Sequence, residues 1–85
     1  MRKLVVEVSD DGFETLMGER ITLFCVNYIY TGKLVGVNDR FVALDEPAIV
    51  YETGAFGEKG WKDAQSLPHS INVMLSMVEA WGIVK

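Results

Sequence analysis

Residues 19–30 read Glu19-Arg20-Ile21-Thr22-Leu23-Phe24-Cys25-Val26-Asn27-Tyr28-Ile29-Tyr30, and they decide the fold class. The stretch is rich in β-branched and aromatic residues, which favour strands. At the two-residue period of a strand both faces are apolar, with Ile21, Leu23, Cys25 and Ile29 on one and Phe24, Val26, Tyr28 and Tyr30 on the other. This pattern predicts a tightly curled barrel on one side and an extra element or a second subunit covering the other.

The chain beyond this stretch alternates short apolar runs with turn residues. We expect a hairpin turn at Thr31-Gly32 and then a strand over 33–37, in which Gly36 indicates a sharp bend or a close backbone approach. After a turn at 38–40, further strands are predicted over 41–44 and 48–53, with 45–47 as an interruption. Four or five short strands joined by tight turns indicate an antiparallel meander.

Three further segments complete the predicted order. Within 1–10, Leu4, Val6 and Val8 alternate with Lys3 and Glu7, which predicts an extra N-terminal strand. Phe13, Leu16 and Met17 recur at helical spacing and predict a short helix. Glycine and lysine gather around residues 54–62, so 57–66 is predicted to be a loop.

A C-terminal helix is predicted over 67–82. Its apolar residues follow the i, i+4, i+7, i+8 pattern of a helix: Leu67, Ile71, Met74, Leu75, Val78 and Trp81. Ser66 is a suitable N-cap, Pro68 fits the first turn, and Gly82 suits the end. The apolar stripe is wide, so we expect it to cap the barrel and to leave surface for a partner.

Length and composition bound the function. Eighty-five residues make one domain, 1–85, and the net charge of −4 means that any nucleic-acid site must be local. No apolar run reaches the roughly 18 to 20 residues of a bilayer span, and we expect a cytoplasmic protein without membrane contact. One cysteine and one histidine cannot form an internal disulfide or a Cys/His zinc site, so neither a metal nor a cofactor is expected.

Two segments together resemble the first motif of the Sm and Sm-like proteins. They read Gly18-Glu19-Arg20-Ile21-Thr22-Leu23 and Tyr30-Thr31-Gly32-Lys33-Leu34-Val35-Gly36-Val37-Asn38. Residues 49–54, Ile49-Val50-Tyr51-Glu52-Thr53-Gly54, look like a degenerate second motif. The resemblance covers about residues 13–56, which would form the core of a mostly β, strongly bent antiparallel barrel of the Sm-like (SH3-like) type with about five strands. It also implies a closed homo-oligomeric ring of roughly five to seven subunits, whose neighbouring edge strands pair.

The resemblance implies a site for one base. Asn38 stands where the family has Asp, and Arg40 and Phe41 offer planar groups for stacking. Glu52 or Thr53 stands where the family has the second-motif Arg. The candidate nucleic-acid-binding residues are Asn38, Asp39, Arg40, Phe41, Tyr51, Thr53 and Gly54.

Other reactive residues favour structural interpretations. His69 lacks a partnered carboxylate, Cys25 lies among apolar neighbours, and residues 54–60 lack the Lys-Ser/Thr pair of a phosphate-binding loop. Trp61 near two lysines could stack on bases or pack on the edge of the barrel. We therefore expect a non-enzymatic ring that binds single-stranded RNA or DNA. The alternative is a protein-interaction or structural ring that has lost base binding.

Overall fold

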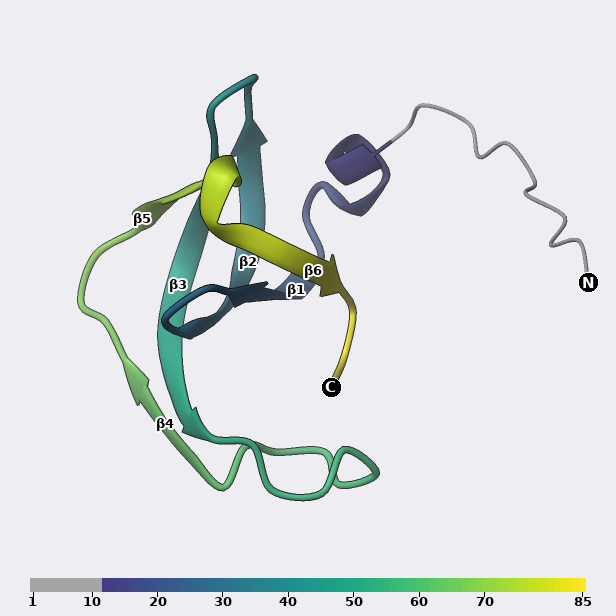
Figure 1. Ribbon diagram of the computed structural model, residues 1–85, viewed down its shortest axis with the longest axis vertical. Helices are drawn as coiled ribbons and strands as arrows, with labels where there is room; N and C mark the ends of the chain where they lie inside the picture. The colour runs from purple at the N-terminus through teal and green to yellow at the C-terminus, as the bar shows by residue number, and fades with distance from the viewer. Residues whose placement is uncertain (1–11) are drawn as a thin grey trace, which may run out of the picture.

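The computed structural model describes residues 12–85, which form one antiparallel, strongly bent sheet (Figure 1). The strands are β1 (Arg20–Cys25), β2 (Ile29–Val37), β3 (Phe41–Glu52), β4 (Asp63–Ser66), β5 (Ile71–Met74) and β6 (Val78–Gly82). Two short 3-10 helices, η1 (Gly12–Leu16) and η2 (Leu75–Met77), accompany them. The mostly β, antiparallel prediction is confirmed, with six strands where about five were expected.

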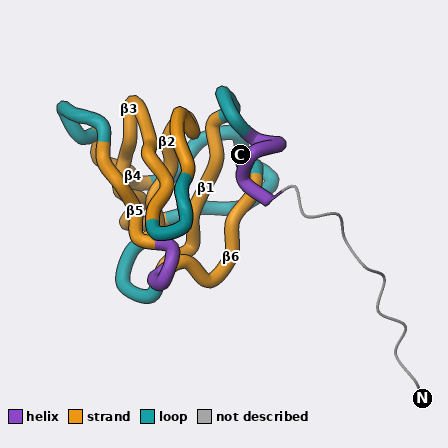
Figure 2. Tube along the Cα trace, turned by 90° about the horizontal axis from the view of Figure 1, so that it is seen from above, coloured by secondary structure: helices purple, strands orange, loops and turns teal. Residues whose placement is uncertain are grey.

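The strands are ordered β4-β3-β2-β1-β6, and β5 also pairs with β3. Figure 2 shows β4 and β5 on one side of the β1–β2 pair and β6 on the other. Over the described residues the sheet is not closed, because β5 and β6 are joined by η2 and not by strand pairing. The sheet therefore has an open edge at each end.

The predicted strand over 19–30 is two strands. The chain reverses between β1 and β2, where the backbone N–H of Cys25 donates to the carbonyl of Tyr28 at 3.0 Å. Val26 and Tyr28 lie in this turn and are exposed, which explains why the stretch is apolar on both faces without being buried on both. The predicted hairpin turn at Thr31-Gly32 is wrong, since these residues lie inside β2, opposite β1 and β3.

A bulge bends β3, and the strand pairs with a different neighbour on each side of the bend. Glu46 has a positive φ of 47°, and the β2–β3 register shifts between Thr31 and Lys33. The expected interruption at 45–47 is therefore a bend inside one continuous strand. Either side of this bend, the first half of β3 pairs with β5 and the second half with β4.

The core lies inside this bend. Its buried members come from four strands and alternate along them: Ile21, Leu23, Leu34, Val42, Leu44 and Val73. The buried hydroxyl of Thr31 donates to the carbonyl of Ile21 at 3.0 Å. The core thus satisfies this polar group without losing apolar packing.

The predicted C-terminal helix over 67–82 is wrong, since this segment contains β5, η2 and β6. Ile71 and Val73 point inward while Asn72 and Met74 are exposed, which is the two-residue period of a strand. The 3-10 turn then places Leu75 and Val78 against the core, and the combined spacing imitates a helix. Met74 is 60% exposed and Trp81 41% exposed, so neither lies in a buried stripe.

The structure also differs from the predicted short helix and from the predicted loop. The short helix predicted from Phe13, Leu16 and Met17 is only a five-residue 3-10 helix, which begins at Gly12 (φ 48°) and ends two residues before Gly18 (φ 86°). Phe13 packs on Trp81 with ring centroids 4.0 Å apart. The predicted loop over 57–66 ends earlier, because β4 begins at Asp63. The predicted strand within 1–10 lies outside the described residues. Across residues 12–85, no helix has the length and apolar character needed to span a membrane.

Candidate functional site

The turn between β2 and β3 is shaped by the side chain of Asn38. Its Oδ1 accepts hydrogen bonds from the backbone N–H groups of Arg40 and Phe41, both at 2.8 Å. The reversal is closed by a third bond, from the N–H of Asn38 to the carbonyl of Phe41 at 3.0 Å. The side-chain oxygen of Asn38 therefore stabilises the turn by accepting from two backbone N–H groups.

The turn lies against a segment that the sequence did not assign to the site. The backbone N–H of Leu75 donates to the carbonyl of Arg40 at 2.8 Å, and Phe41 pairs with Met74. We call residues 38–41 together with 74–77 the β2–β3 rim. On it Asp39 and Arg40 are exposed and Phe41 is half-buried, so a cation and an aromatic ring that are neighbours in sequence are both accessible to solvent.

Tyr51, Thr53 and Gly54 lie at the opposite end of β3 (Figure 1). Tyr51 is exposed near the end of the strand, and Gly54 follows with a φ of 68°. The structure brings Asn38, Asp39, Arg40 and Phe41 together but does not bring Tyr51, Thr53 and Gly54 to them within one chain. The second side of the rim is residues 74–77. The strand-like alternation of Ile71 to Met74 was the sequence signal for this second side. The helical spacing of the same segment concealed that signal.

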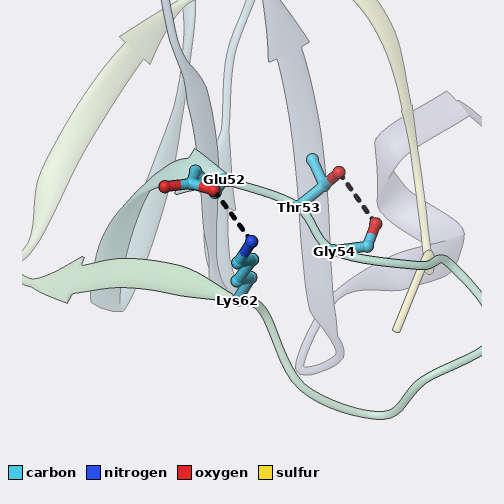
Figure 3. Close-up of polar contacts among 4 residues, drawn as sticks. All are labelled: Glu52, Thr53, Gly54 and Lys62. Atoms are coloured by element: carbon cyan, nitrogen blue, oxygen red, sulfur yellow. Dashed lines mark hydrogen bonds and ion pairs between the residues drawn. The ribbon is translucent and has the colours of Figure 1, made fainter.

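The far end of β3 opens into the loop over residues 53–62. Figure 3 shows its base, where Lys62 Nζ lies 3.5 Å from Glu52 Oε2 and the hydroxyl of Thr53 donates to the carbonyl of Gly54 at 3.0 Å. A Cβ added to Gly54 would come within 3.3 Å of the Cβ of Lys62. The two ends of the loop therefore approach closely, and the positive φ of Gly54 favours glycine there.

The reactive groups near the sheet have limited nucleophilic character. Burial raises the pKa of the Cys25 thiol, and the negative charge of Glu79 raises it further. Burial also raises the pKa of Tyr30, with smaller contributions from Cys25, Tyr28 and Tyr51. Both groups stay protonated at neutral pH. In the part of the chain that the structure describes, no three His, Cys, Asp or Glu side chains gather where they could hold a metal ion.

Comparison with known protein families, with curated proteins and with solved structures gives no match to this chain.

Proposed function

We propose that this chain is a cytoplasmic, non-enzymatic subunit of an Sm-like ring, which binds single-stranded RNA or DNA at the β2–β3 rim. The observation that carries the proposal is the hydrogen bond from Leu75 N–H to the carbonyl of Arg40. It places two separate segments side by side around an exposed Arg40 and a half-buried Phe41. A base held between two segments is what the Sm-like resemblance implies, although the second segment is 74–77 and not 51–54.

The topology supports a small, bent barrel of the Sm-like type. A meander of β1, β2 and a bent β3 is followed by β4 and β5, and a 3-10 turn then returns β6 to the far edge of β1. The bulge at Glu46 provides the strong bend that such a barrel needs.

The open edges support assembly into a ring. Among the described strands, β4, β5 and β6 each pair with one neighbour only, so an unpaired edge remains at each end of the sheet. Exposed apolar side chains lie beside these edges, namely Met74, Met77, Trp81 and Ile83. An edge of β5 on one subunit can pair with the edge of β6 on the next, and repetition of this heterologous contact closes a ring.

A ring also explains how an acidic protein could bind a polyanion. Each rim offers one exposed cation, Arg40, while Asp39 beside it opposes phosphate binding. A single site is therefore weak. Repetition around a ring makes later contacts intramolecular, so the total affinity exceeds that of one site. Stacking on Phe41 would add about 1 to 3 kcal/mol per base without sequence preference.

Replacing Arg40 with alanine is expected to weaken binding of single-stranded oligonucleotides and to lower the slope of log affinity against log salt by about 1, because one phosphate contact per site is lost. Fluorescence anisotropy with oligo-U, oligo-A and single-stranded DNA, at about 20 to 200 mM salt, measures both quantities. Lys59→Ala is the matched control, since it removes one exposed cation in the 53–62 loop, at the other end of β3.

Three outcomes would contradict this location. They are no binding of any oligonucleotide at the lowest salt, unchanged binding by Arg40→Ala, and a loss on Lys59→Ala that equals the loss on Arg40→Ala.

A protein-interaction ring is the second candidate, and one surface favours it. A largely apolar hollow of about 410 Å³ lies on the sheet and is lined by Tyr30, Ile49, Leu67, Ile71, Asn72, Val73, Met74 and Met77. An apolar hollow of this kind fits a side chain of a protein partner better than a phosphate backbone. Absence of oligonucleotide binding from an intact ring would favour this function.

A further inference from the structure

The ammonium group of Lys85 lies against the loop over residues 53–62. Lys85 Nζ donates to three backbone carbonyl oxygens, those of Thr53 at 2.6 Å, Ala55 at 3.0 Å and Gly60 at 2.7 Å. A lysine ammonium has three N–H donors. Each donor therefore has a partner, and all three partners come from one loop that is more than twenty residues away in sequence.

Two aromatic rings of the loop also lie close to the Lys85 ammonium group. Lys85 Nζ lies 4.7 Å from the ring centroid of Trp61 and 5.6 Å from that of Phe56, both within the range of cation–π attraction. The two rings meet edge to face, with centroids 6.5 Å apart. The ammonium thus faces carbonyl oxygens and aromatic rings together, and all of these groups favour a cation.

The loop holds this shape through contacts of its own. The carbonyl of Thr53 also accepts from the N–H of Lys62 at 3.4 Å, and the carbonyl of Ala55 also accepts from the N–H of Glu58 at 3.1 Å. The ion pair between Glu52 and Lys62 lies at the base of the loop (Figure 3). Two of the three acceptors are therefore positioned by bonds that do not involve Lys85, and such preorganisation lowers the cost of binding.

We propose that residues 53–61 form a binding site for a primary ammonium group of the lysine type, which Lys85 occupies within its own chain. A primary alkylammonium enters this site when Lys85 is removed. The site distinguishes primary from quaternary ammonium, because a quaternary group keeps the cation–π attraction but has no N–H to donate to the three carbonyls. It lies at the other end of β3 from the β2–β3 rim and does not depend on nucleic-acid binding.

The test titrates the protein with n-butylammonium and with n-butyltrimethylammonium, and follows the backbone amide signals of Ala55 and Gly60 by NMR. Three forms are compared: the parent, Lys85→Ala, and Lys85→Ala combined with Trp61→Ala. The amide signals of Leu23 and Leu34 in the core report whether each form is folded.

We expect Lys85→Ala to give saturable shifts with n-butylammonium, at least about tenfold weaker binding of the trimethyl compound, and a parent that responds to neither, since Lys85 is present at a high effective concentration. The double variant should lose at least part of the affinity for n-butylammonium. The proposal is overturned if folded Lys85→Ala gives no saturable shift, if both compounds bind equally, if the parent binds n-butylammonium as Lys85→Ala does, or if a folded double variant binds it with unchanged affinity.

Discussion

Gly32→Val is expected to destabilise the fold severely, and Gly32→Ala to cost about 1 to 3 kcal/mol of unfolding free energy. Gly32 lies in β2 opposite the bulge of β3. A Cβ at this position would lie 3.0 Å from the Cβ of Leu44, 3.1 Å from the carbonyl oxygen of Asp45 and 3.2 Å from the Cα of Pro47. Two of these atoms belong to the backbone of the bend, so they cannot move without changing the curvature of the sheet. Valine adds two further methyl groups to the same space.

Gly36→Ala is the matched control for this prediction. Gly36 lies in the same strand, but a Cβ there would meet only the Cβ of Ala43 at 3.5 Å, an ordinary contact. We expect a change of less than about 1 kcal/mol, since the backbone conformation is extended and space is available. Urea melts at one fixed protein concentration measure both variants. Equal midpoints for Gly32→Ala and Gly36→Ala would contradict the close approach at the bend.

Leu34→Ala is expected to cost about 2 to 5 kcal/mol. The side chain of Leu34 is 0% exposed and lies in the core cluster with Leu23 and Leu44. Truncation removes buried apolar contacts and leaves a cavity in a sheet that is stabilised by few other buried groups. A domain of this size has only about 5 to 15 kcal/mol of total stability, so the variant should be close to unfolding at 37 °C.

Val35→Ala provides the comparison, because the next residue points to the other face and is 48% exposed. Its expected cost is about 1 kcal/mol or less, mostly from lower strand propensity. The two variants measured by the same urea melts test the alternation of β2 directly. A Val35→Ala variant that is destabilised as much as Leu34→Ala would mean that the outer face of β2 is covered, as it would be if this face lies in a subunit interface.

Local pattern was sufficient to predict the meander but not its register. The β-branched residues of β1 and β2 and the turn at Asn38 are local signals, and they gave the strand class and the β2–β3 reversal correctly. The reversal at residues 26–28 contains no Gly or Pro, and for this reason the hairpin turn was predicted at Thr31-Gly32 instead. The need for Gly32 comes from Asp45 and Pro47, which are distant in sequence.

The C-terminal segment shows a second reason for failure. A strand, a one-turn 3-10 helix and another strand place Ile71, Val73, Leu75 and Val78 inward. Ile71, Leu75 and Val78 also stand at the i, i+4 and i+7 positions of a helix, so the same residues fit a helical template. The β-branched residues Ile71, Val73 and Val78 are a strand signal in the same segment. Because the segment was predicted to be helical, the second side of the β2–β3 rim was missed.

No local sequence motif predicts the β2–β3 rim or the proposed ammonium site. Arg40 and Phe41 were selected from the sequence, but their neighbour Leu75 follows from pairing of β3 with β5. The site around Lys85 uses backbone carbonyls of the 53–62 loop, which any residue type supplies. Only Phe56 and Trp61 could have suggested it, and aromatic residues in a loop have several other uses.

The central proposal, a ring built from open sheet edges, is tested most directly by the mass of the particle in solution. Size-exclusion chromatography coupled to light scattering, at micromolar protein concentration, is expected to give about five to seven times the 9.5 kDa of one chain. A single, concentration-independent mass in this range would agree with a closed ring. A stable particle of 9.5 kDa would contradict the ring and the multivalent binding that depends on it.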